Sequence, residues 1–123
     1  MRDKSDDIAK LLPLREPTFY ILLSLTDGEK HGYAILKDVE EISDARVTLS
    51  TGTLYEALAR LVDQSLIERV TTDADTGEEN SHPGRPRKAY RITSRGEHVL
   101  QAEMARLQSL IVAARQRLVT AAE

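Results

Sequence analysis

The chain has 123 residues, which is the size of one small domain, or of one domain with an appended helix. Hydrophobic residues make up 41% of it and aromatic residues only 4%, so a small aliphatic core would gain stability by sharing surface with a partner. The absence of cysteine excludes disulfides and cysteine-ligated metals. The net charge of −3 argues mildly against nucleic-acid binding, unless positive charge is concentrated locally.

The start of the chain does not resemble a signal peptide. Asp3, Asp6 and Asp7 occupy the region that should be cationic, and the apolar run Phe19–Leu23 is too short to span a membrane. We therefore expect a cytoplasmic protein with no membrane partner. The charged, aperiodic residues 1–13 are expected to be flexible.

Two helices and a short strand are predicted next. A first helix covers Pro17–Leu25, with proline at its start, and Thr26–Gly28 ends it with turn-forming residues. Gly32 opens a second helix, in which apolar residues recur at helical spacing: Ile35, Leu36, Val39 and Ile42. Arg46–Leu49 alternates and is β-branched, which predicts a short strand.

A third helix is predicted over Ser50–Leu66. The Ser50 hydroxyl can cap it by accepting from the N–H of Gly52 or Thr53. Its expected buried stripe is Leu54, Leu58, Leu61 and Val62. This helix presents short hydrogen-bonding side chains at its N-terminus, as a DNA-reading helix does.

Gly52 lies in the first turn of this helix, where glycine reduces helix stability. It has two explanations: close approach of DNA to the backbone, or a crowded contact with the second helix. Tyr55 and Arg60 lie off the apolar stripe and could reach phosphates. For Arg60, an ion pair with Glu56 one turn away is the alternative.

A β-hairpin follows, with strands expected at Ile67–Thr72 and Arg87–Ile92 around a polar loop, Asp73–Pro86. Its returning arm is basic and carries no acid, with Arg85, Arg87, Lys88, Arg91 and Arg95. The first three are candidates for DNA contacts, with a solvated cationic strand as the alternative. Tyr90 is expected to pack in the sheet.

The last helix, capped by Thr93 or Ser94, has the most regular pattern. Apolar residues recur in steps of four and three: Leu100, Met104, Leu107, Ile111, Ala114 and Leu118. This is the seam of a coiled coil. From Glu97 to Ala121 the helix would reach about 37 Å, too long for the small body to cover. The seam predicts a dimer interface, with a helix folded back on its own domain as the alternative.

No catalytic or metal-binding pattern is present. His31, His82 and His98 match no ligand spacing, and no phosphate-binding loop, nucleophile motif or paired-carboxylate motif occurs. We expect no enzyme activity, no metal and no cofactor.

The ordered motifs resemble the PadR family of transcriptional regulators, in its short form with a single C-terminal helix. The resemblance spans about Leu14–Leu118, and its four motifs are His31–Ile35, Leu49–Tyr55, Leu66–Glu68 and Arg87–Thr93. It implies a homodimeric repressor that is released from its operator by a small ligand or a stress signal.

We therefore predict a mostly α fold with a small β-hairpin wing: a winged helix-turn-helix DNA-binding domain over residues 1–92 and a C-terminal dimerisation helix over 93–123. The predicted function is sequence-specific regulation of transcription by a ligand-responsive dimer on inverted-repeat double-stranded DNA. The alternative is a winged-helix protein–protein adaptor.

The residues expected to contact DNA are Ser50, Thr51, Gly52, Thr53, Tyr55, Arg60, Arg85, Arg87 and Lys88. The effector is unknown, and with no tryptophan it would rely on Phe19, Tyr20 or aliphatic walls.

Overall fold

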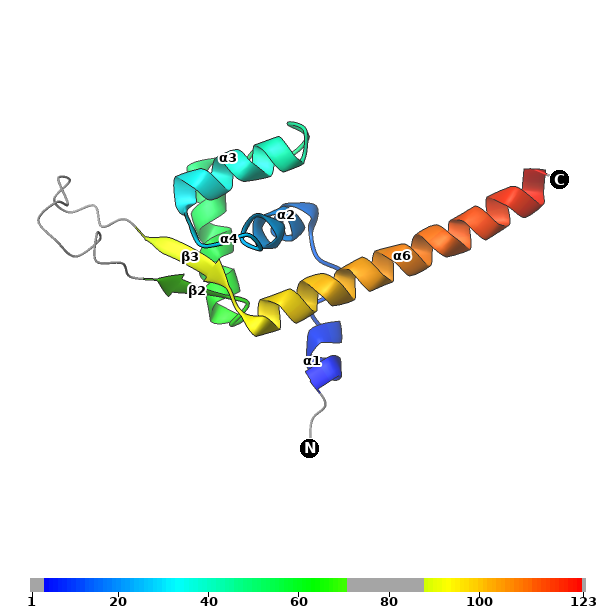
Figure 1. The fold of residues 1–123 in the computed structure, drawn as a ribbon, viewed down its shortest axis with the longest axis horizontal. Helices are drawn as coiled ribbons and strands as arrows, with labels where there is room; N and C mark the ends of the chain where they lie inside the picture. Colours follow the sequence, from blue (N-terminus) through cyan, green and yellow to red (C-terminus); the bar gives the residue numbers. More distant parts are fainter. Residues whose placement is uncertain (1–3, 71–87, 123) are drawn as a thin grey trace, which may run out of the picture.

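The computed structural model of the chain describes residues 4–70 and 88–122. Its elements are α1 (Lys4–Ala9), α2 (Glu16–Ser24), β1 (Lys30–His31), α3 (Gly32–Ile42), α4 (Thr51–Asp63), β2 (Ile67–Val70), β3 (Ala89–Ile92) and α6 (Ser94–Ala122). Figure 1 shows α2, α3 and α4 gathered in one body, β2 and β3 at one end of it, and α6 extending away from the other. The predicted class, mostly α with a small antiparallel sheet, is confirmed.

The three central helices pack because each presents an aliphatic stripe to the others. α2 contacts α3 and α6, and α4 contacts α3 and β2. Leu54, Leu58 and Leu61 of α4 are buried as predicted, Ala57 is buried in addition, and Val62 is only half-buried. The hydrophobic core consists of Ile21, Leu22, Leu25, Ile35, Val39, Val47, Leu54, Ala57, Leu58, Leu61, Leu66, Ile67, Tyr90, Val99 and Leu100. Ile42, expected inside, is exposed at the end of α3.

The sheet has the order β1-β3-β2, and both pairs of strands are antiparallel. Lys30 pairs with Tyr90 on one side of β3, and Ile67 pairs with Ile92 on the other. The two-residue strand β1 was not expected from the sequence. β1 pairs with the edge of β3 that faces away from β2, and α3 begins directly after β1. The hairpin of β2 and β3 is therefore joined to the start of α3.

The prediction of a strand at Arg46–Leu49 is wrong. This segment links α3 to α4 without pairing to the sheet. Its hydrogen bonds are local, because the Ser43 hydroxyl accepts from Val47 N at 3.0 Å and donates to Val47 O at 3.3 Å. A β-branched segment needs a partner strand, and here Val47 instead enters the helical core.

Residues 1–13, which were expected to be flexible, include described residues that form a helix and pack against the core. Lys4–Ala9 form α1, which packs on α6. The residues Ile8, Leu11, Leu12 and Leu14 pack against the core. The backbone N–H of Leu14 donates to the carboxylate of Glu103 at 2.9 Å, across 89 residues of chain. Burial of these aliphatic side chains overcomes the charged, aperiodic local sequence.

The long helix α6 begins where Thr93 caps it. The Thr93 hydroxyl accepts from Gly96 N at 3.0 Å and donates to Ser65 O at 2.7 Å. Of the two expected caps, Thr93 is therefore the one used, and Ser94 is the first helical residue. A Cβ at Gly96 would overlap the backbone oxygen of Leu66. This close approach fixes the angle at which α6 leaves the body.

Candidate nucleic-acid interface

The first turn of α4 is exposed and open. Ser50 has extended backbone angles, and its hydroxyl accepts from Thr53 N at 3.1 Å, so the predicted cap is confirmed. The Ser50 hydroxyl also donates to Thr53 Oγ1 at 3.0 Å. Thr51, Gly52 and Thr53 are all exposed. This end of the helix can therefore receive a ligand without any rearrangement of the fold.

Gly52 is not crowded by the second helix. A Cβ built at Gly52 meets no atom within 4 Å, so the packing explanation for this glycine is excluded. The crowded glycine between α3 and α4 is Gly32, at the start of α3, where a Cβ would overlap the Tyr55 hydroxyl and lie 2.8 Å from Tyr55 Cζ. Room for close approach from outside remains as the explanation for Gly52.

Tyr55 joins the first turns of α3 and α4. Its ring lies over Gly32, yet the side chain is still 45% exposed. The start of α3 is therefore held beside the start of α4. On α3, Tyr33 is 69% exposed, and the Lys37 ammonium lies 5.6 Å from its ring centroid. Tyr33 and Lys37, four residues apart, therefore place a polar group and a cation on the same exposed face of α3. Both lie off the apolar positions Ile35, Val39 and Ile42, so the helical pattern identifies them as outward-facing.

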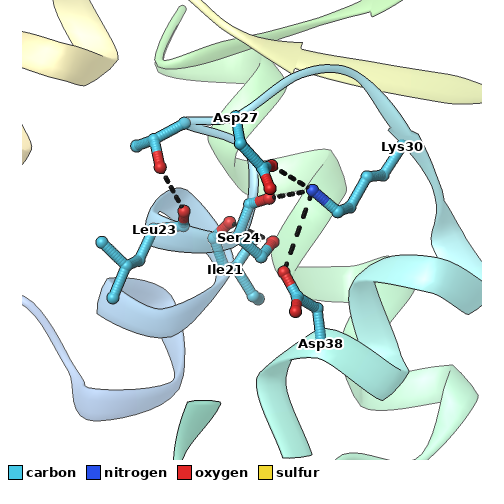
Figure 2. A network of polar contacts seen from close by, with 7 residues as sticks. Ile21, Leu23, Ser24, Asp27, Lys30 and Asp38 are labelled. Atoms are coloured by element: carbon cyan, nitrogen blue, oxygen red, sulfur yellow. Dashed lines mark hydrogen bonds and ion pairs between the residues drawn. The ribbon is translucent and has the colours of Figure 1, made fainter. Parts of the chain in front are cut away.

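Lys30 holds the turn between α2 and α3, as Figure 2 shows. Its ammonium donates to Ser24 O at 2.6 Å and to the Asp27 carboxylate, and Asp38 lies 3.8 Å away. The hydrogen bond from Lys30 lowers the pKa of Asp27. Since Lys30 is engaged three times, it positions α3 and is not available as a phosphate ligand.

The base of the hairpin lies beside the start of α3. The His31 ring faces the Lys88 carbonyl, with Nδ1 at 3.3 Å, and His31 pairs with Ala89 in the sheet. Lys88 itself is exposed. Arg85 and Arg87 lie outside the described residues. Tyr90 is 3% exposed and packs in the sheet, as predicted.

Arg60 lies far from the first turn of α4, about 12 Å along the helix from Gly52. In the part of the chain that the structure describes, it forms no ion pair with Glu56, so that alternative is not realised. Arg60 instead borders a shallow depression of about 130 Å³, which is lined by Leu11, Pro13, Leu14, Arg15, Thr18, Arg60, Leu61, Gln64 and Leu66. The structure thus separates Arg60 from the other candidate residues of α4.

The predicted seam of α6 is exposed beyond its first member. Leu100 is only 5% exposed and belongs to the chain's own core. Met104, Leu107, Ile111, Ala114 and Leu118 are exposed. Three large apolar residues outside the seam, Leu110, Val112 and Val119, are exposed as well. A pattern that alternates strictly between steps of four and three residues does not include these three. Leu110, however, lies three residues after Leu107 and therefore next to it on the helix surface.

Buried polar contacts tie α6 to the N-terminal segment. The Glu103 carboxylate is 2% exposed and accepts from Arg106 at 2.6 and 3.0 Å as well as from Leu14 N. The hydrogen bond from Arg106 lowers the pKa of Glu103, against the opposite effect of burial. Sequence periodicity cannot identify this contact, because its partners are far apart in the chain.

Phe19 and Tyr20, the candidates for effector contact, pack against the core. Their rings meet edge to face, with centroids 6.1 Å apart, and Arg46 Nη2 donates to the Tyr20 hydroxyl at 3.4 Å.

Within the described ranges no group of three metal-ligating side chains is found. No helix among the described residues is long and apolar enough to cross a membrane.

Comparisons with known proteins identify related chains. A family model described as "Transcriptional regulator PadR-like family" matches residues 21–102. A curated relative, an uncharacterized 37.1 kDa protein in transposon TN4556 of Streptomyces fradiae, is 37% identical over 94 residues. The match covers 74% of this chain and 24% of the relative, so the chain spans about a quarter of the relative's length.

Solved structures share the fold. A transcriptional regulator from Clostridium thermocellum is 27% identical, with a TM-score of 0.63 over 91% of this chain and 94% of that one. Bacillus subtilis PadR, solved in complex with operator DNA, is 26% identical, with a TM-score of 0.59 over 73% of this chain and 47% of that one.

Proposed function

The chain belongs to the PadR-like family of transcriptional regulators, and from this premise we propose that it binds operator DNA sequence-specifically as a homodimer and represses transcription. Members of this family are transcription regulators and not enzymes. We assign DNA reading to residues 1–92 and dimerisation to residues 93–123. A protein with this function works in the cytoplasm, where it meets DNA.

The observation that carries the proposal is the open first turn of α4. Thr51, Gly52 and Thr53 are exposed at the N-terminus of α4, and a Cβ at Gly52 would meet no atom of the described residues within 4 Å. A helix N-terminus attracts phosphate, and the first residues of a recognition helix contact base edges in the major groove. Bacillus subtilis PadR, which is similar to this chain, was solved in complex with operator DNA, and this supports DNA as the ligand.

The hairpin is the second contact. Lys88 stands beside the start of α3, which Tyr55 joins to α4, so one cation of the hairpin lies near the reading helix. In the sequence, Arg85 and Arg87 come shortly before Lys88 on the same arm of the hairpin, and they supply two further positive charges. In this arrangement the wing contacts phosphates and fixes the orientation of α4.

We infer that two copies pair through the exposed apolar face of α6. The five exposed seam residues would be covered by the same face of the second helix, as a two-fold interface requires. The two α4 helices would then meet an inverted repeat whose half-site centres lie about 34 Å apart. A small effector would release the operator by changing this distance.

A selection of bound duplexes from a random DNA pool tests the function. We expect an inverted repeat to be enriched, and titration of the selected DNA to give an affinity at least about 1,000-fold higher than that of a scrambled duplex at the same salt concentration. Equal affinity for both duplexes would contradict sequence-specific regulation.

The adaptor alternative makes a different prediction for the same protein. The net charge of −3 would suit a protein–protein module, and such a module has no reason to bind a polyanion. Retention on heparin with elution by salt supports the DNA interface, whereas passage through heparin together with failed enrichment supports the adaptor.

A further inference from the structure

The outward face of α4 is a single stripe. Leu54, Ala57, Leu58 and Leu61 are buried, and the residues on the opposite side of the helix are Gly52, Glu56, Ala59 and Asp63. Their spacing of four, three and four residues places them one above another. Gly52 and Ala59 carry almost no side chain, so Glu56 is the group that extends furthest from the middle of the stripe.

Glu56 has no partner in the part of the chain that the structure describes. Among the described residues no hydrogen bond or ion pair involves its carboxylate, and Arg60, one turn away, does not approach it. An ionised carboxylate at the centre of a DNA-facing helix is repelled by phosphates. Its position is therefore unfavourable for general affinity, and it calls for a specific partner with hydrogen-bond donors.

The base edges of the major groove offer such donors unequally. Guanine presents two acceptors and thymine presents one, so both repel a carboxylate. Adenine presents an amino group beside the acceptor N7, whereas cytosine presents its N4 amino group with no acceptor next to it. A carboxylate, which only accepts, therefore discriminates best in favour of cytosine.

We propose that Glu56 is a specificity-determining residue that accepts a hydrogen bond from the N4 amino group of one cytosine in each half-site. This rests on the proposed function, because it requires α4 to lie in the major groove. Glu56 lies about 6 Å along the helix from Gly52, within the N-terminal part of a recognition helix that reaches bases. It does not belong to the residues expected from the sequence to bind DNA.

The test repeats the selection from random DNA with three proteins: the wild type, Glu56→Gln and Asp63→Asn. Asp63 lies on the same stripe but at the far end of α4, so Asp63→Asn removes the same charge without removing the proposed base contact. Both variants should bind a scrambled duplex somewhat more tightly than the wild type, because each removes one negative charge. Thermal melts should be unchanged, because both side chains are exposed.

Only Glu56→Gln should alter the selected sequence. We expect the wild type and Asp63→Asn to require cytosine at one position of each half-site. In Glu56→Gln this preference should fall by about tenfold or more, and adenine should replace cytosine, since glutamine pairs with adenine N6 and N7. Titrations with duplexes that differ only at this base pair measure the change.

Two failures are distinguishable. If the wild type enriches a motif and Glu56→Gln enriches the same motif with equal strength, Glu56 does not read a base, and the DNA-binding function stands. If the wild type enriches no motif, both the function and the role of Glu56 are refuted.

Discussion

Gly52 and Gly96 both lie in the first turn of a helix, but their surroundings differ. Gly52 faces open space, whereas a Cβ at Gly96 overlaps the Leu66 carbonyl. Glycine in a helix is unfavourable in either case, so each needs a reason. For Gly96 the reason lies inside the fold. For Gly52 we propose a reason outside the fold, namely DNA that approaches the N-terminus of the helix.

Gly52→Ala should raise stability and lower operator affinity. Alanine is the better helix former by up to about 1 kcal/mol, and its methyl group would enter the approach surface. Gly96→Ala is the matched variant, and it should lower stability by about 1–3 kcal/mol because backbone must move. Thermal melts and operator titrations measure both. A lower melting temperature with normal binding for Gly52→Ala would show that this glycine serves the core.

At the scale of elements, the contact between the N-terminal segment and α6 depends on the buried carboxylate Glu103. Arg106 and Leu14 N both donate to it, and its pKa is lowered in the folded protein. A depressed pKa means that the carboxylate stabilises the fold above its unfolded-state pKa, about 4.3, and that this contribution is lost as pH falls through the folded pKa.

Glu103→Gln should therefore lower stability at pH 7 by about 1–3 kcal/mol, because the hydrogen bonds to a charged acceptor are lost. Its free energy of unfolding should also vary less than that of the wild type between about pH 5 and pH 3. Urea titrations across this range measure both effects. Glu41→Gln, on an exposed glutamate of α3, is the control, and it should leave the fall in the free energy of unfolding between these pH values unchanged. If this fall were identical in Glu103→Gln and the wild type, the carboxylate of Glu103 would not stabilise the fold through its ionised form.

At the scale of the whole molecule, α6 projects beyond the body that the other elements form (Figure 1). Its length and its exposed apolar residues are unusual for a helix that functions alone in water. Pairing with a second copy would cover this surface and would also set the distance between two DNA-reading helices. Assembly and operator spacing are then consequences of the same helix.

Leu107→Asp should convert the dimer to monomers. Leu107 is 37% exposed in the single chain, so the charge is tolerated in the monomer but would be desolvated in the interface, once from each copy. Val112→Asp is the control, because Val112 is exposed on another side of α6. Sedimentation velocity should give a monomer for the first variant and the wild-type mass for the second. An unchanged dimer for Leu107→Asp would remove the seam assignment.

Local patterns were enough to predict part of the site. The Ser50 cap, the exposed first turn of α4 and the packing of Tyr90 follow from side-chain chemistry and spacing within a few residues. The place of Arg60 could not be predicted, because it depends on how the N-terminal segment returns to the end of α4. The sequence indicates Glu56 only as a partner for Arg60, and the lack of a partner for its carboxylate among the described residues follows from the tertiary structure.

The sequence by itself determined α2, α3, α4 and α6, the Ser50 cap and most of the apolar face that each helix buries, because these depend on hydrogen bonds and apolar spacing within one or two turns. Only the tertiary structure decided that Lys30–His31 and not Arg46–Leu49 joins the sheet, since a strand forms where an edge is free to pair. It also decided that the N-terminal residues pack on α6, and that Leu100 belongs to the core. These outcomes depend on burial and sterics between segments distant in the chain, which no local pattern encodes.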